Sequence, residues 1–215
     1  MAAIFRPWHN TAVKISLIVV ATALGGGVGG LMVYARSPLA TRMQDPVEQP
    51  VQFDHRHHVG DLGIDCRYCH DGVETSPRAG IPAVSVCMNC HVQVWNKSPI
   101  LEPVREAYFK NQPILWNRVY KLPDFVYFDH SIHVAKGVGC VECHGRVDKQ
   151  PAIEKMQPMS MTFCLDCHRA PEGRIRTVDQ VTNMKWSAHG NPEISRTLAK
   201  EYDVHTRTTC TTCHR

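Results

Sequence analysis

The chain has 215 residues and a formal net charge of +4, which is enough length for one ordinary domain or for a smaller domain with a membrane segment. The mild positive charge contains no run of Lys or Arg, so composition gives no reason to expect a nucleic-acid partner. Ten cysteines and thirteen histidines are the unusual part of the composition.

The first element in chain order is an apolar segment at residues 15–36, whose first twenty residues carry no charge. We expect a transmembrane helix here after a cytoplasmic N-terminus at 1–14, because about 20 helical residues span a bilayer. A cleaved signal peptide is the alternative, but its apolar region is shorter, about 7–15 residues. Two basic residues flank each end, so the positive-inside rule leaves the orientation open: Arg6 and Lys14, and Arg36 and Arg42.

Glycines in this segment recur at intervals of four residues, as Gly25/Gly29 and Gly26/Gly30. Small residues at this spacing let a second helix approach closely in lipid, so they favour a partner helix. The proline-containing stretch 37–52 follows and reads as an extended linker.

Every cysteine belongs to a C-x-x-C-H motif, and there are five such motifs. In this motif two thiols form thioethers to a c-type haem and the adjacent histidine binds the iron from one side. Zinc sites or disulfides would leave the five adjacent histidines unexplained. Since c-type haems are attached outside the cytoplasm, we expect residues 53–215 to form a pentahaem domain on the periplasmic or extracytoplasmic side. The haem-attaching cysteines are Cys66, Cys69, Cys87, Cys90, Cys140, Cys143, Cys164, Cys167, Cys210 and Cys213, and the proximal ligands are His70, His91, His144, His168 and His214.

A histidine-rich segment occurs twice: FDHRHHV at 53–59 recurs as FDHSIHV at 128–134, each time followed by two C-x-x-C-H motifs. The pattern predicts a duplicated two-haem unit at 53–91 and 128–168, with a fifth haem at 210–214. Histidines three positions apart on a helical turn share a face, so both can reach an iron. The candidate distal ligands are therefore His55, His58, His130 and His133.

This arrangement resembles small multihaem cytochromes of the c3/c7 type. The resemblance implies that the first histidine of each pair binds the haem that follows it, and that the second reaches another haem. A fifth distal ligand stays open between Met161 and His189, followed by His205, Met156 and Met159, while His57 points elsewhere. A thioether ligand would raise that haem's reduction potential relative to a bis-histidine haem.

The rest of the domain has about 34 residues per haem, too few for a conventional core around each. We therefore expect a mainly α-helical and irregular fold with little regular secondary structure and a haem-filled core. Each C-x-x-C-H should lie at a short helical turn, residues 101–110 should form a helix, and the polar stretch 171–209 should run over the surface. The aromatic side chains between Trp95 and Phe128 fit packing beside porphyrin, or a quinol pocket.

The anchor, the five motifs and the stretches GDLGIDCRYCH, CMNCH, LPDFVYFDHSIHV and CLDCHR together resemble the pentahaem cytochrome c subunit of bacterial alternative complex III. The resemblance covers nearly the whole chain. It implies an electron-transfer subunit of a membrane quinol oxidoreductase in the respiratory chain, with an iron–sulfur subunit, polytopic membrane subunits and a monohaem cytochrome c as partners. Quinol would be bound by, or shared with, another subunit. In that family a histidine often stands where this chain has Tyr120, and it would supply a fifth distal ligand.

The sequence contains no nucleophile elbow, phosphate-binding loop or metal-hydrolase motif, so we expect an electron-transfer component and not a catalytic chain by itself. Two alternatives remain. One is a stand-alone, membrane-anchored multihaem quinol dehydrogenase that feeds a terminal reductase. The other is a multihaem reductase with an open iron that acts on a small molecule.

Overall fold

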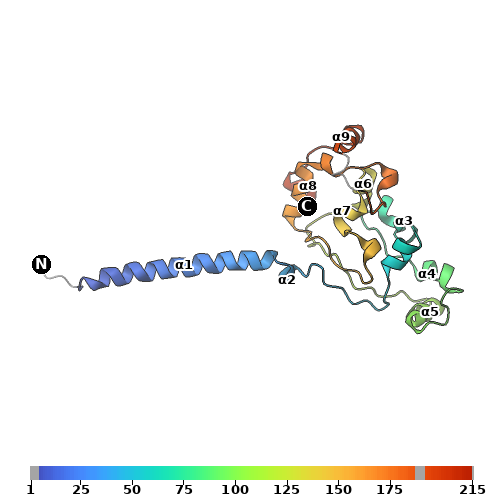
Figure 1. The fold of residues 1–215 in the computed structure, drawn as a ribbon, viewed down its shortest axis with the longest axis horizontal. Helices are drawn as coiled ribbons and strands as arrows, with labels where there is room; N and C mark the ends of the chain where they lie inside the picture. Colours follow the sequence, from blue (N-terminus) through green and yellow to red (C-terminus); the bar gives the residue numbers. More distant parts are fainter. Residues whose placement is uncertain (1–4, 187–191, 215) are drawn as a thin grey trace. The chain divides into compact units, whose positions relative to one another are not determined.

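The computed structural model describes residues 5–186 and 192–214 and separates the chain into two compact units, residues 1–43 and 44–215 (Figure 1). The first unit is dominated by α1, Trp8–Arg36, which begins directly after Pro7 and has no buried side chain. This helix has a mean hydropathy of 1.9, so by length and composition it can cross a membrane, as either an anchor or a signal sequence. Ser37 ends it and caps the short α2, Pro38–Thr41.

The second unit is built from short helices and irregular connections (Figure 1). The described residues contain no β-strand, only isolated bridges at Pro46↔Glu154, Val126↔His214 and Val138↔Ile175. This confirms the expected mainly helical and irregular fold. The helices are α3 (Cys66–Cys69), α4 (Val84–His91), α5 (Glu102–Phe109), α6 (His130–Ala135), α7 (Cys140–His144), α8 (Met161–Arg169), α9 (Pro192–Glu201) and α10 (Cys210–Cys213), and Arg56–Asp61 forms a π-helical turn.

All five C-x-x-C-H motifs lie on short helices, as predicted: α3, α4, α7, α8 and α10. Polar side chains cap the N-termini of two of these helices. Asp65 accepts a hydrogen bond from the Arg67 amide, and Ser160 accepts one from the Phe163 amide. In α3 the His70 amide donates to the Cys66 carbonyl over 2.8 Å, which closes one turn. The turn brings both thiols and the following imidazole to adjacent positions.

The protein core is small, because the buried apolar side chains form three separate clusters. The first joins α4 to α5 through Met88, Leu101 and Val104, and α5 lies within the predicted helix 101–110. The second brings together Val73, Val134 and Val181 from distant parts of the sequence. A core divided in this way contributes less stability than one continuous core, so contacts beyond apolar packing must hold the unit together.

The prediction that residues 171–209 run over the surface is wrong for part of the stretch, of which residues 187–191 lie outside the described part of the chain. Ile175 and Val181 are each 1% exposed, and α9 buries Leu198 against Ile175. A backbone hydrogen bond also holds the segment in place, since the Arg176 amide donates to Gly137 O over 2.9 Å. Most residues of the stretch are polar, so its sequence gave little indication that a few apolar residues pack it against the domain.

The C-terminal half of the predicted linker 37–52 is held against the second unit. The Gln44 and Val47 amides each donate over 2.9 Å, to the carbonyls of Lys155 and Ile153, and Pro46 forms a β-bridge with Glu154. Val51 is 5% exposed. The free part of the connection is therefore shorter than the proline pattern suggested.

A candidate multihaem site

The two histidine-rich turns have the same internal geometry. Phe53 stacks on His58 at 4.3 Å between ring centres, and Phe128 stacks on His133 at 4.6 Å. The first histidine of each turn meets the same phenylalanine edge-on, at 4.7 Å in both copies. The duplication seen in the sequence is therefore also a duplication of structure.

Backbone carbonyls fix the orientation of most of these imidazoles. His58 Nδ1 lies 2.8 Å from Asp54 O, and His133 Nδ1 lies 2.6 Å from Asp129 O. A carbonyl only accepts, so Nδ1 carries the proton and Nε2 is left with its lone pair free to bind a metal. The same contact holds four more imidazoles: His70 on Gly80 O, His91 on Val94 O, His130 on Pro77 O and His214 on Phe125 O.

Each second-turn histidine faces the histidine of a C-x-x-C-H motif. The ring centres of His130 and His144 are 6.4 Å apart and nearly parallel, with an interplanar angle of 13°. His133 and His168 are 6.1 Å apart. The turn therefore presents one imidazole to each of the two motifs that follow it in the sequence.

The first turn repeats this arrangement. His58 and His91 have ring centres 6.1 Å apart. The neighbouring His70 contributes to lowering the pKa of His55, so the two imidazoles lie close together. The first histidine of each turn thus meets the first following motif, and the second histidine meets the second.

These separations fit an iron ion between two imidazoles. With a metal–nitrogen bond of about 2 Å, two imidazoles on opposite sides of one metal have ring centres about 6 Å apart. When bound, haem would supply one-electron chemistry between its ferric and ferrous states.

Burial favours the neutral form of His55, His133 and His144, because it lowers the pKa of each, and the neutral form is the one that binds metal. Burial, with the neighbouring His70 and His58, lowers the pKa of His55 to about 4. Burial, with His130, His70 and His55, lowers the pKa of His144 to about 4. His55 Nδ1 is also a buried nitrogen without a hydrogen-bond partner. A buried, neutral imidazole whose ring nitrogen has no hydrogen-bond partner is well suited to bind a metal ion.

No disulfide joins the cysteines of the five motifs. Within residues 5–186 and 192–214, no group of three or more His, Cys, Asp or Glu side chains is placed to hold a metal ion by itself. A zinc site would need such a group. The arrangement therefore fits a metal that arrives inside a macrocycle and takes only axial ligands from the protein.

The fifth motif lacks a facing imidazole among its described contacts. His214 stacks on Phe125 at 5.7 Å and bonds to the carbonyl of the same residue. Of the two leading candidates for a fifth distal ligand, Met161 is 68% exposed at the start of α8, and His189 lies outside the described residues. The third candidate, His205, makes an exposed ion pair with Asp203 at 2.7 Å.

The other candidates lie in different surroundings. His57 stacks on Trp95 at 5.9 Å, and its ring also meets that of His58 edge-on at 5.6 Å. Met156 packs against Gly145, and Met159 has a left-handed backbone with φ of 51°. Tyr120 contacts His144 edge-on at 4.8 Å and hydrogen-bonds the motif backbone at Cys143 O. It therefore supports the third motif.

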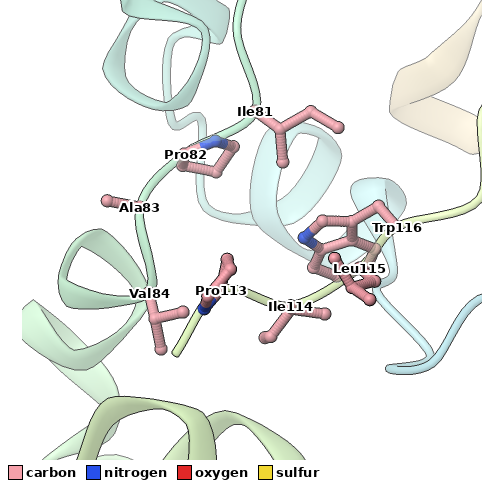
Figure 2. Close-up of a pocket in the computed structure, with 8 residues that line it drawn as sticks. All are labelled: Ile81, Pro82, Ala83, Val84, Pro113, Ile114, Leu115 and Trp116. Carbon is pink, nitrogen blue, oxygen red and sulfur yellow. The ribbon is translucent and has the colours of Figure 1, made fainter. Parts of the chain in front are cut away.

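An apolar cavity of about 340 Å³ lies beside the second motif (Figure 2). Residues 81–84, just before the helix that carries Cys87, line one side, and residues 113–116 line the other. Among these eight side chains only the indole N–H of Trp116 can form a hydrogen bond. The cavity thus provides apolar walls suited to a macrocycle and few groups to orient a quinol head.

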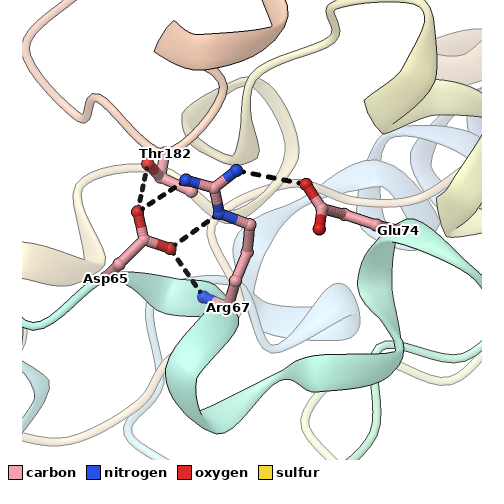
Figure 3. A network of polar contacts seen from close by, with 4 residues as sticks. All are labelled: Asp65, Arg67, Glu74 and Thr182. Carbon is pink, nitrogen blue, oxygen red and sulfur yellow. Dashed lines mark hydrogen bonds and ion pairs between the residues drawn. The ribbon is translucent and has the colours of Figure 1, made fainter.

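A polar network ties the first motif to the C-terminal third of the domain (Figure 3). Asp65 receives hydrogen bonds from the Arg67 backbone amide and guanidinium, each 2.9 Å from Oδ1. Thr182 Oγ1 donates to the other oxygen of the same carboxylate over 2.9 Å, and Arg67 also pairs with Glu74. The hydrogen bond from Arg67 lowers the pKa of Asp65.

Sequence reasoning missed the most buried charge of the domain. Arg176 has no exposed side-chain surface, pairs with Glu142 of the third motif at 2.5 Å and covers the Trp186 ring. Its Nε has no hydrogen-bond partner. Gly139 makes room for it, since a Cβ there would lie 2.1 Å from the guanidinium carbon. The one signal was Glu142 inside the motif, a carboxylate that needs a cation once it is buried.

Comparison with known proteins supports the haem interpretation. Residues 126–215, which contain the last three motifs, match the family described as cytochrome c7 and related cytochrome c. The chain is also 35% identical over 98 residues to a protein of Nitratidesulfovibrio vulgaris strain Hildenborough named menaquinone reductase, multihaem cytochrome c subunit. That match spans 45% of this chain and 46% of the relative, so it covers less than half of either protein. The last three motifs thus lie in a region similar to cytochrome c7, and this similarity implies covalently bound c-type haem.

Proposed function

We propose that this chain is the electron-relay subunit of a membrane quinol:electron-acceptor oxidoreductase of the alternative complex III type, with five c-type haems. The observation that carries the proposal is the set of facing imidazole pairs, each next to a C-x-x-C-H helix and spaced for one iron. Such centres exchange electrons without making or breaking bonds, so the chain acts as a relay and another subunit provides the quinol chemistry.

We assign the axial ligands by these pairs. His70 would bind its iron with His55, His91 with His58, His144 with His130, and His168 with His133. His214 would be the proximal ligand of the fifth haem, with Met161 or His189 completing it. The carbonyls bonded to Nδ1 would hold six of these imidazoles in orientation, and they would also raise ligand basicity.

The location follows from α1 and from the haem attachment chemistry. We propose that α1 anchors the chain in the cytoplasmic membrane as a single pass, with the N-terminus inside and the haem domain on the extracytoplasmic side. The apolar length of α1 and the connection at residues 44–52 support this. The glycine spacing in α1 supports contact with a helix of another subunit, where no Cβ stands in the way.

The partners are proposed by class: an iron–sulfur subunit, polytopic membrane subunits and a monohaem cytochrome c. The relative's name, which describes a subunit of a menaquinone reductase, supports assembly into a quinone-linked complex. The same name motivates a second candidate, in which electrons run in the opposite direction, from an extracytoplasmic donor to quinone. Redox centres of this kind work in both directions, so the potentials of donor and acceptor decide between the two.

Neighbouring histidines of one turn provide a test of the ligand assignment. His58→Ala should leave one haem without its distal ligand, and a high-spin ferric signal should appear in the electron paramagnetic resonance spectrum of the purified chain. His57→Ala is the matched control, because His57 faces Trp95 and should change no haem spectrum. Identical low-spin spectra for both variants would contradict the assignment.

Purification from native membranes tests the subunit assignment. We expect the chain to co-purify with polytopic and iron–sulfur subunits, and the complex to reduce its haems with a quinol analogue. The chain alone should be reduced slowly. Rapid reduction of the isolated chain by quinol would instead favour a stand-alone quinol dehydrogenase that feeds a terminal reductase.

A further inference from the structure

The C-x-x-C-H motifs contact one another in an order that differs from their order in the sequence. We number the motifs in chain order: motif I is 66–70, motif II is 87–91, motif III is 140–144, motif IV is 164–168 and motif V is 210–214. A relay that followed the sequence would pass from II to III. The contacts described below place motif I between these two.

Motifs I and II are direct neighbours. Asn89 Nδ2, inside motif II, donates to Tyr68 Oη, inside motif I, over 3.0 Å. Burial and the nearby Cys87 thiol raise the pKa of Cys69, so the thiols of the two motifs also lie close together. The turn Arg56–Asp61 with its preceding His55 presents imidazoles to both motifs.

Motifs I and III are also direct neighbours, although they belong to different repeats. The Cys140 amide donates to Val181 O over 2.9 Å, and the hydroxyl of the next residue, Thr182, donates to Asp65, which directly precedes motif I. His130, the partner of motif III, donates to Pro77 O over 2.9 Å, in the loop that follows motif I. The neighbouring Cys140 thiol also raises the pKa of Cys66, as expected for two thiols that lie close together.

Motif III is also a neighbour of motif IV, and motif IV is a neighbour of motif V. His130 and His133 lie on the single turn of α6, and they face His144 of motif III and His168 of motif IV, so these two motifs are neighbours. Burial and the Cys213 thiol raise the pKa of Cys164, which links motif IV to motif V. The backbone confirms this last step, since the Arg207 amide, three residues before motif V, donates to His168 O.

We propose that electrons pass through the haem sites in the order II–I–III–IV–V, and that sites II and V are the ends at which the chain exchanges electrons with its partners. The junction between the two repeats is then the contact of motif I with motif III. The order deepens the relay function proposed above and rests on it. Each step moves one electron, so that one iron is oxidised as its neighbour is reduced.

The exposure of the cysteines supports the choice of ends. Eight of the ten are partly buried, and the two exposed ones are Cys90 of motif II and Cys210 of motif V. A terminal site must come close to a donor or an acceptor outside the chain, whereas an internal site needs only its two neighbours. The partner at one end would be the quinol-linked subunit, and at the other an extracytoplasmic redox protein.

Removal of single haems tests the order. In the detergent-purified full-length chain, Cys66→Ser/Cys69→Ser would remove the haem of motif I, and Cys87→Ser/Cys90→Ser that of motif II. Adjacent redox centres shift each other's midpoint potentials electrostatically. In a redox titration followed by electron paramagnetic resonance, loss of haem I should shift two of the remaining haems, and loss of haem II only one. The reverse result is what the sequence order requires, and it would overturn the proposal.

If a cysteine variant does not fold, two further measurements still test the order. His55→Met and His58→Met keep every thioether and alter the potential of one haem each, so the same count of shifted neighbours applies. Electron cryo-microscopy of the unaltered protein gives the iron-to-iron distances directly, and haem I should be the nearest neighbour of haem II. A wild-type chain without five haems would overturn both the function and the order, whereas five haems with iron II between irons I and III would overturn the order alone.

Discussion

At the scale of single residues, Arg176 shows how one buried charge organises the C-terminal part of the domain. Its guanidinium touches the third motif through Glu142 and fills the space left by Gly139. Burial lowers the pKa of Arg176, although a guanidinium remains protonated at neutral pH. A buried cation that lost its partner would be costly, so the pair must form together.

Arg176→Met should therefore lower the free energy of unfolding by about 3 kcal/mol, because it removes one partner of a buried ion pair. Arg174→Met is the matched control: Arg174 pairs with the same Glu142 at 3.6 Å but is 38% exposed, so its loss should cost less than about 1 kcal/mol. Denaturant titration followed by circular dichroism measures both. Equal effects would show that burial of Arg176 does not matter.

Asp65 gives a pH-dependent prediction. A carboxyl whose pKa is lowered by folding stabilises the protein above its unfolded value of about 4, and this contribution is lost as the pH falls through the folded pKa. Asp65→Asn should cost about 1 kcal/mol at pH 7, through a weaker helix cap and the lost ion pair. The difference from wild type should shrink below pH 4. A difference that stayed constant across this range would contradict the electrostatic explanation.

At the scale of elements, the motif helices are too short to be stable alone. The helix of motif I has four residues, and isolated helices need about 12–15 to be even marginally stable in water. Side-chain caps and hydrogen bonds between motifs compensate in part, as with Asp65 and with the Tyr68–Asn89 contact. In the proposed pentahaem form, covalent attachment at both cysteines of each turn would restrain these helices further.

The helix α9 is the element whose packing is easiest to test. Leu198 is 7% exposed and belongs to the cluster with Ile175, so Leu198→Ala should destabilise the domain by about 2–4 kcal/mol. Ile194 lies on the same helix at 50% exposure, and Ile194→Ala should cost less than about 1 kcal/mol. Resistance to proteolysis and the denaturation midpoint measure this. Similar losses for the two variants would mean that α9 is not docked as described.

At the scale of the whole molecule, the division into residues 1–43 and 44–215 makes the anchor separable. Replacement of residues 1–43 by a cleavable secretion signal should give an extracytoplasmic protein that is soluble without detergent. Its haem content and absorption spectrum should equal those of the full chain. Fractionation and haem staining on a denaturing gel measure the outcome.

The full-length chain is the control for this experiment. It should stay in the membrane fraction through a carbonate wash and require detergent for release. Release by carbonate would show that α1 is removed as a signal sequence. Retention of the shortened protein in the membrane would show that partner subunits hold it there.

The sequence by itself determined the cofactor class, the duplicated unit and the position of each motif on a short helical turn. These depend on covalent chemistry and local spacing: C-x-x-C-H fixes haem attachment, and Phe-Asp-His-x-x-His fixes two imidazoles on one turn. Only the tertiary structure decided which imidazole meets which motif, the burial of Ile175 and Val181, and the contact of motif I with motif III. These depend on packing between residues far apart in the chain, such as Thr182 on Asp65, and on backbone carbonyls, which carry no residue-specific signal.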